Sequence, residues 1–152
     1  MDVLGGNFTK YKDIYIYYVH PTEYLIQQFK LNGKLVRTIK QQSEQCRPLQ
    51  LSLKVFDPQS FRKWQQSWDP VHAVIATNEG FLGVLYRSTQ ASLDTVINVI
   101  DLYDVEGKFI VGNIHTSYLP VCVDKKNMIY CINQQLQYIQ ENPILFRFKI
   151  KA

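Results

Sequence analysis

The three histidines, His20, His72 and His115, are the first residues that could support metal binding or proton transfer. The expected strands place His20 in a turn, His72 at a strand start and His115 at a strand end. None of the three has a second metal-binding side chain at short spacing. A metal ion is held by several such side chains brought together. We therefore predict structural roles for the histidines and no metal site, and we retain His20 and His115 as candidates for a binding surface.

Asp101, Asp104 and Glu106 lie along one expected strand and the turn after it. Closely spaced carboxylates can bind a metal ion or exchange protons with a substrate. Solvation of a turn explains these three residues better. The sequence has neither a strand–turn–helix setting for a nucleophilic serine nor a glycine-rich phosphate loop before a helix. It therefore predicts no catalytic residue and no cofactor.

Cys122 and Cys131 flank an expected turn at residues 124–127, so they could lie opposite one another on adjacent strands. A disulfide between them is one interpretation, although its geometry is demanding, and two buried thiols are the favoured one. Cys46 is then left over, and an odd thiol without a secretion signal indicates a reducing compartment. No cysteine spacing matches a zinc site.

Trp64 and Trp68 follow Phe61 at helical spacing in a stretch that begins with Asp57 and Pro58. Asp is a favoured N-cap and Pro a favoured first helical residue, which predicts a short amphipathic helix over about residues 58–68. The two tryptophans could form a flat platform that binds carbohydrate or peptide. Docking of the aromatic stripe on a sheet is the favoured interpretation, with binding as the alternative.

The chain that positions these candidates is rich in strand-forming residues. It has 152 residues, of which 46% are apolar and 13% aromatic, with ten Tyr and eight Phe. Branched and aromatic side chains fit a half-buried pleated surface, so the composition favours an all-β protein. The length is that of one ordinary domain, and we expect a single domain over residues 1–152.

One segment occurs almost twice, because residues 29–36 (FKLNGKLV) and 103–110 (YDVEGKFI) align without a gap. Each has an aromatic strand end, a turn centred on Gly33 or Gly107, then Lys and an apolar pair, which is typical of a β-hairpin. The recurrence indicates repeated antiparallel units, the middle one four-stranded and the last one strand short. We expect these units over residues 8–41, 71–115 and 119–151, with residues 42–70 inserted between the first two.

The units resemble the blades of six-bladed β-propellers of the TolB-like and NHL-like group. Aligned pairs at Ile14-Tyr15, Leu85-Tyr86 and Ile129-Tyr130 and the glycine hairpins carry the resemblance, which covers most of the chain outside residues 42–70. It implies antiparallel four-stranded blades of a partial propeller, because these units cannot close a ring of four to eight blades. The chain is then part of a larger propeller whose last blade gains an N-terminal strand, half of a homodimer, or a curved open sheet.

The net charge is +4, and most of the basic excess lies before residue 66. Nucleic-acid binding needs a clustered basic stripe, which the sequence lacks, so we expect no nucleic-acid partner. No apolar run reaches membrane-spanning length and no secretory signal is present, so we expect no membrane partner. The expected location is the cytoplasm if the chain is complete and the periplasm or extracellular space if it is a fragment.

These features favour a non-enzymatic binding or scaffolding module that contacts a protein or a small polar ligand. Its binding residues are expected on loops held by the strands, where His20 would approach residues 88–94 and 133–143. The alternatives are part of a propeller enzyme, a hydrolase or lyase with its site near the ring axis, and a self-associating structural protein. Ionisable residues on the ring axis would favour the enzyme, whereas an apolar axis would favour the binding module. A large apolar subunit interface would favour self-association.

Overall fold

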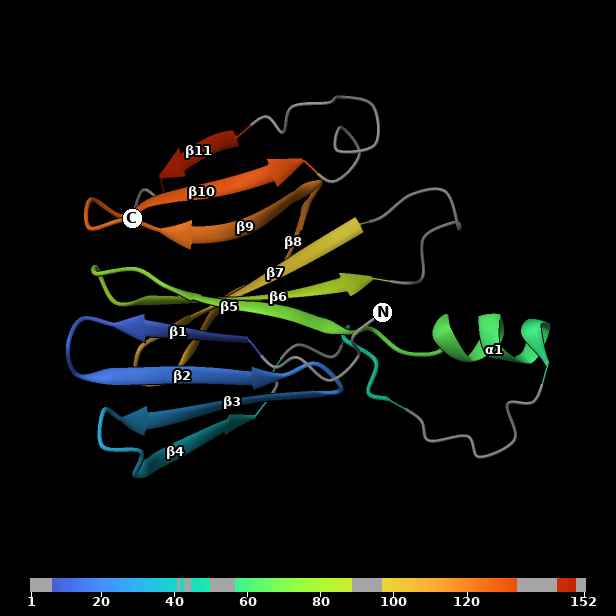
Figure 1. The fold of residues 1–152 in the computed structure, drawn as a ribbon, viewed down its shortest axis with the longest axis horizontal. Helices are drawn as coiled ribbons and strands as arrows, with labels where there is room; N and C mark the ends of the chain where they lie inside the picture. Colours follow the sequence, from blue (N-terminus) through green and yellow to red (C-terminus); the bar gives the residue numbers. More distant parts are fainter. Residues whose placement is uncertain are drawn as a thin grey trace.

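The structure, a computed structural model, describes residues 7–40, 42, 45–49, 57–88, 97–133 and 145–149. Within these ranges the protein has eleven strands in three antiparallel sheets and one short helix, and Figure 1 shows the sheets stacked in chain order with the helix beyond one end. The prediction of an all-β fold with four-stranded antiparallel sheets and a single short helix is confirmed.

Sheet A contains the first four strands in chain order: β1 (Asn7–Tyr11), β2 (Tyr15–His20), β3 (Glu23–Lys30) and β4 (Leu35–Lys40). The N-terminal strand does not complete the last unit, as a larger propeller would require. It pairs antiparallel with β2, with Asn7 opposite Val19 and Tyr11 opposite Tyr15. The sequence did not reveal this hairpin because its turn uses Lys12 at a φ of 49°, without Gly, Pro or Asn-Gly to mark it.

Sheet B again has four strands in chain order: β5 (Val71–Ala76), β6 (Phe81–Ser88), β7 (Ile97–Asp104) and β8 (Phe109–Thr116). Sheet C has three in the described residues: β9 (Tyr118–Val123), β10 (Met128–Asn133) and β11 (Leu145–Lys149), with β10 in the middle. Sheet B lies between the other two, so β5 from Ala73 to Ala76 and β6 from Leu82 to Tyr86 are buried runs. Strands covered on both faces are expected to be apolar throughout.

The helix α1 (Pro58–Gln65) begins as the sequence predicted. The carboxylate of Asp57 accepts hydrogen bonds from the backbone N–H groups of Gln59 and Ser60, at 3.0 and 2.9 Å, which satisfies two helix-start donors. The helix ends three residues before Trp68, whose side chain is buried. It is too short and too polar to cross a membrane. It is the single helix among the residues that the structure describes.

The main core lies between sheets A and B, where Tyr17, Ile26, Leu82, Tyr86 and Tyr103 are almost fully buried. A smaller core of Ile75, Ile129 and Cys131 joins sheets B and C. Buried hydroxyl groups span the main core: the Tyr17 hydroxyl donates to the carbonyl oxygen of Val105 at 2.9 Å. The stack is therefore held by apolar burial together with polar contacts from one sheet to the next.

The three sheets do not close into a ring in the part of the chain that the structure describes, which contradicts the propeller implied by the resemblance. The motifs behind that resemblance are real but local. Gly33 and Gly107 adopt φ values of 83° and 90°, as the hairpin turns require. Such motifs determine how neighbouring strands pair inside a sheet, and they do not determine how many sheets stack or whether the first meets the last.

Candidate functional site

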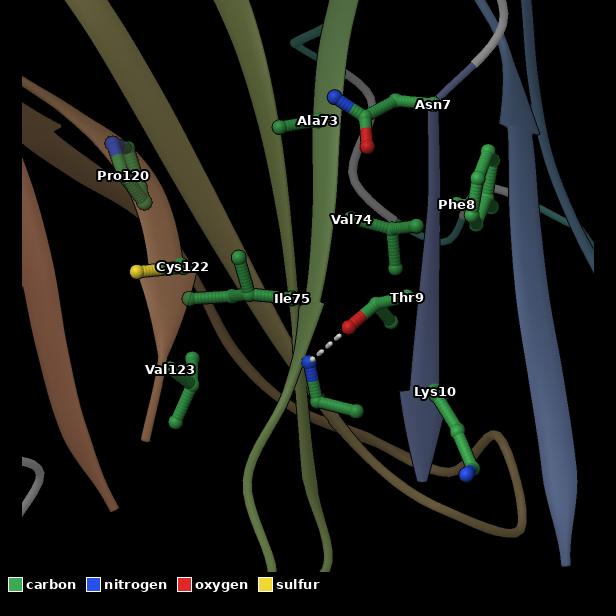
Figure 2. A pocket seen from close by; sticks show the side chains of 11 residues that line it. Asn7, Phe8, Thr9, Lys10, Ala73, Val74, Ile75, Pro120, Cys122 and Val123 are labelled. Carbon is green, nitrogen blue, oxygen red and sulfur yellow. Dashed lines mark hydrogen bonds between the residues drawn. The ribbon is translucent and has the colours of Figure 1, made fainter. Parts of the chain in front are cut away.

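The first strands of the three sheets, β1, β5 and β9, line a shared groove with a volume of about 330 Å³. Each is an outer strand of its own sheet, because β1 pairs only with β2, β5 only with β6 and β9 only with β10. Figure 2 shows the three strands running in the same direction past the groove. A shallow site is thus built entirely from strands, which makes it a rigid part of the fold.

The β1 wall of the groove is polar. The side-chain amide of Asn7 donates to the carbonyl oxygen of His72 at 3.0 Å. The Thr9 hydroxyl accepts from the backbone N–H of Ala76 at 3.3 Å (Figure 2). These side chains satisfy backbone groups along the edge of β5, which would otherwise be open to other chains. Lys10, also on this wall, forms an exposed ion pair with Asp13.

The β5 floor and the β9 wall are mainly apolar. Ala73 and Ile75 point from β5 toward β9, and Val123 lies opposite them (Figure 2). Pro120 lines the groove from β9. Because proline has no backbone N–H group, the edge of β9 has one hydrogen-bond donor fewer at this position. The groove therefore places an apolar floor beside a wall of hydroxyl and amide groups.

The cysteines do not form the disulfide considered from the sequence. All three are free, and Cys122 lies opposite Tyr130 in the sheet while Cys131 lies opposite Pro120. Cys122 is exposed at the groove, so the expectation of two buried thiols is wrong for this residue. Burial raises the pKa of Cys131 to about 11 and that of Cys46 to about 12, so both stay protonated near neutral pH.

The four predicted binding residues are not brought together. His20, at the end of β2, lies beside a small hollow of about 160 Å³ on the outer face of sheet A, and its Nδ1 is 2.8 Å from the Thr22 hydroxyl. His115, on β8, is exposed, and its Nε2 lies 2.7 Å from Oδ1 of Asn113. None of the four lines the groove. Of the loops expected beside His20, residues 89–94 and 134–143 lie outside the described residues.

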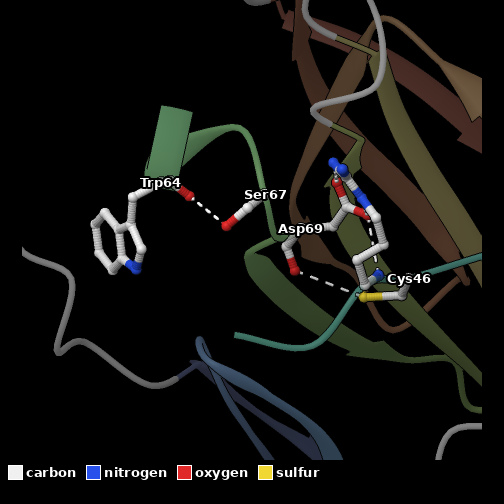
Figure 3. A network of polar contacts seen from close by, with 5 residues as sticks. Cys46, Trp64, Ser67 and Asp69 are labelled. Atoms are coloured by element: carbon white, nitrogen blue, oxygen red, sulfur yellow. Dashed lines mark hydrogen bonds and ion pairs between the residues drawn. The ribbon is translucent and has the colours of Figure 1, made fainter. Parts of the chain in front are cut away.

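The two tryptophans form an aromatic row with Phe61. The ring centroids of Phe61 and Trp64 are 5.6 Å apart, and those of Trp64 and Trp68 are 5.8 Å apart. Figure 3 shows how the segment after the helix is fixed: the Ser67 hydroxyl donates to the Trp64 carbonyl oxygen at 2.7 Å, and the Cys46 thiol donates to the Asp69 carbonyl oxygen at 3.5 Å. Trp68 is buried, Trp64 is half-buried and Phe61 is 45% exposed, and α1 itself has no buried residue, so the docking of the aromatic row stays a prediction.

The acidic residues along β7 have structural partners. Asp101 is fully buried and accepts hydrogen bonds from the Tyr24 hydroxyl at 2.7 Å and the Asn113 backbone N–H at 3.0 Å. Turn solvation therefore does not explain Asp101, although it fits Asp104, which accepts from the Lys108 N–H at 2.7 Å in the hairpin turn. No group of three or more His, Cys, Asp or Glu among the described residues could hold a metal ion.

Sequence reasoning did not identify the groove residues. They come from three strands that are distant in the chain, and most are Ala, Val, Ile, Thr or Asn, which carry no chemical signature. The available signal was the position of each segment, as the first strand of its expected unit. That signal becomes useful only when the stacking of the sheets is known.

No family model and no curated protein matches the sequence. A solved structure, the crystal structure of a member of the DUF4221 family from Bacteroides vulgatus, is similar to this chain with a TM-score of 0.62 and 8% sequence identity. The similarity covers 97% of this chain and 46% of the solved chain, so this chain spans about half the length of its neighbour. At this identity the likeness shows the fold alone, and the TolB-like and NHL-like assignment is wrong.

Proposed function

We propose that the protein is a non-enzymatic binding module that holds a short extended segment of another polypeptide in the groove between β1, β5 and β9. The observation that carries this proposal is the position of the groove among three outer strands. Extended peptides lie along strands, where pockets for alternate side chains give specificity. Asn7 and Thr9 already bond part of the β5 edge, so the apolar floor of the groove supplies the pocket. The volume, about 330 Å³, is at the lower end of the range for ligand sites and suits a few residues of such a peptide.

The lining of the groove supports binding over catalysis. Lys10 is the one charged residue that lines the groove. Asn7 already donates a hydrogen bond to the backbone of β5, and Thr9 already accepts one from it. A catalytic site generally combines titratable groups whose pKa values are shifted by their surroundings. In this groove, Ala73, Ile75 and Val123 instead offer apolar contacts to a ligand side chain.

Panning a phage-displayed random dodecapeptide library on the immobilised protein tests the proposal, with enriched peptides then measured by fluorescence anisotropy. Ala73→Leu places a larger side chain in the groove, whereas the matched control Ala73→Ser keeps the original size. We expect enriched peptides to bind wild type and Ala73→Ser alike and to lose affinity for Ala73→Leu by at least about tenfold, or ~1.4 kcal/mol. Thermal melts establish that both variants are folded.

Two outcomes would contradict the proposal. One is that no peptide is enriched over a bare surface. The other is that the enriched peptides bind the folded Ala73→Leu variant as tightly as wild type, because the groove would then not be their binding site.

A further inference from the structure

The small hollow beside His20 is separate from the groove and is built from two neighbouring strands of sheet A. Its lining residues alternate along each strand and therefore share one face of the sheet: Tyr18 and His20 of β2, and Glu23, Leu25 and Gln27 of β3. The residues between them, such as Val19 and Ile26, point into the core with sheet B. The hollow thus lies on the face of sheet A that is turned away from sheet B.

Two cross-strand pairs form the rim of the hollow. Tyr18 lies opposite Gln27, and His20 lies opposite Glu23. Side chains that face each other on neighbouring strands have Cβ atoms roughly 5 Å apart, so each pair places two polar groups within reach of one small ligand. Leu25, between Glu23 and Gln27 on β3, adds an apolar contact.

The imidazole of His20 is oriented by Thr22. The Thr22 backbone N–H donates to Nδ1 at 3.3 Å, and the Thr22 hydroxyl oxygen lies 2.8 Å from the same atom. Because Nδ1 accepts, the proton of the neutral ring is on Nε2. The Tyr18 ring contacts the imidazole edge to face, with ring centroids 6.5 Å apart. His20 therefore offers an N–H donor whose orientation is fixed.

The polar groups around the hollow have no hydrogen-bond or ion-pair partner within the part of the chain that the structure describes. Four groups share this property: the Tyr18 hydroxyl, the His20 Nε2, the Glu23 carboxylate and the Gln27 amide. Several convergent polar groups beside an apolar contact are the usual features of a small-molecule site. The hollow therefore has the groups to hold a polar ligand.

The chemistry of these groups matches a neutral ring that carries several hydroxyl groups. The Glu23 carboxylate only accepts hydrogen bonds, the His20 Nε2–H donates, and the phenol and the amide do both. Sugar hydroxyl groups also do both, and the apolar C–H face of a sugar can lie against the flat ring of Tyr18. Lys40 lies opposite Leu25 in the sheet and offsets the charge of Glu23, so the surroundings do not favour an ion of either sign.

We infer that this hollow binds a single neutral sugar ring. Its volume, about 160 Å³, is about half that of the smallest usual ligand pockets, which limits the ligand to one ring. A ligand of this size in an open hollow binds weakly, with a dissociation constant on the order of millimolar. The inference does not depend on the proposed peptide binding, because the two sites share no residue.

Titration of ¹⁵N-labelled protein with the methyl glycosides of glucose, galactose and mannose, each to about 100 mM, tests the inference by two-dimensional NMR. At least one glycoside should shift the signals of Tyr18, Glu23 and Gln27 in a saturable way. Glycerol and tetramethylammonium chloride at the same concentration should not, because glycerol has no ring to lie on Tyr18 and the cation has no hydroxyl groups.

Glu23→Ala removes the carboxylate from the hollow, and Glu79→Ala is its matched control, since Glu79 is also exposed and lies in another hairpin turn. We expect Glu23→Ala to raise the dissociation constant of the glycoside at least about tenfold and Glu79→Ala to leave it unchanged. Thermal melts establish that both variants are folded.

Three outcomes would overturn the inference. One is that none of the three glycosides causes a saturable shift at the hollow. Another is that the folded Glu23→Ala variant binds the glycoside as tightly as wild type. The third is that tetramethylammonium shifts the same signals as strongly as the sugars, because the hollow would then select a cation through Glu23.

Discussion

The three cysteines occupy two kinds of environment, buried and exposed, which chemical modification can distinguish. Cys46 and Cys131 are buried, and burial raises their pKa to about 12 and about 11, whereas Cys122 is exposed beside the groove. The thiolate is the reactive form of cysteine, so a buried thiol with a raised pKa reacts slowly near neutral pH.

We expect one thiol per chain to react rapidly with Ellman's reagent at pH 8, and the Cys122→Ser variant to lose this rapid phase. The other two thiols should react after unfolding in guanidinium chloride, or in the native protein only as the pH rises toward their pKa values. Two rapidly reacting thiols in the native wild type would contradict the burial of Cys46 or Cys131.

At the scale of single residues, the sequence shows which side chains could be functional but does not show what surrounds each of them in the fold. Asp101 resembles a turn residue in the sequence, yet it is buried, where the hydroxyl of Tyr24 donates to it from another sheet. A carboxylate can be buried when such donors replace water. The donor comes from a residue far away in the chain, so no local pattern could reveal it.

The two repeated hairpins offer a matched test of turn geometry at the scale of an element. Both glycines have a positive φ, but a side chain at Gly33 would have open space, whereas a Cβ at Gly107 would lie 2.5 Å from Cγ1 of Ile39. Gly33→Ala should lower the free energy of unfolding by about 1–2 kcal/mol through backbone strain alone. Gly107→Ala should cost a further ~1–3 kcal/mol because it also overpacks the contact with Ile39.

Urea unfolding of the two variants beside wild type measures both costs. Equal losses would contradict the close packing of the second hairpin on sheet A. No loss at either position would mean that these turns do not need the left-handed backbone.

Elements with a local signal were predictable, and one without such a signal was not. The helix start at Asp57-Pro58 and the hairpins at Gly33 and Gly107 follow from residues adjacent in the chain. The β1–β2 hairpin turns at Lys12, where the turn carries no glycine or proline. The first strand was therefore assigned to the wrong sheet in the larger-propeller interpretation.

The whole molecule depends on contacts between distant segments, and the ion pair of Arg47 with Asp69 is one of them. The Asp69 side chain is 1% exposed and accepts from the Arg47 backbone N–H, Nε and Nη2 at 3.0 to 3.1 Å. This pair fixes the segment around Cys46 to the chain just before sheet B. The pair of Lys10 with Asp13 provides a contrast, because both of its side chains are largely exposed.

We expect Asp69→Ala to lower the free energy of unfolding by about 3 kcal/mol, because it leaves Arg47 without its anion in a mostly buried site. Asp13→Ala should have no measurable effect, as for most exposed pairs. Thermal or urea unfolding compares the two variants directly. Similar stabilities of Asp69→Ala and Asp13→Ala would contradict the structural role of this pair.

The arrangement of whole sheets could not be predicted from the sequence. Hairpin motifs specify strand pairing, and all three sheets contain the expected pairs. The stacking order, the position of β1 and the groove between β1, β5 and β9 depend on burial across segments that no local pattern links. The candidate site was missed for the same reason, since each of its walls comes from a different sheet.

The central claim is that the groove between the three first strands binds an extended peptide. The most direct test is a titration of ¹⁵N-labelled protein with a peptide enriched from the dodecapeptide library, followed by two-dimensional ¹H–¹⁵N NMR spectra. The claim predicts that the largest shift changes lie in β1, β5 and β9, around Thr9, Ile75 and Val123. Changes concentrated on α1 or on β8 around His115, with the groove signals unmoved, would contradict it.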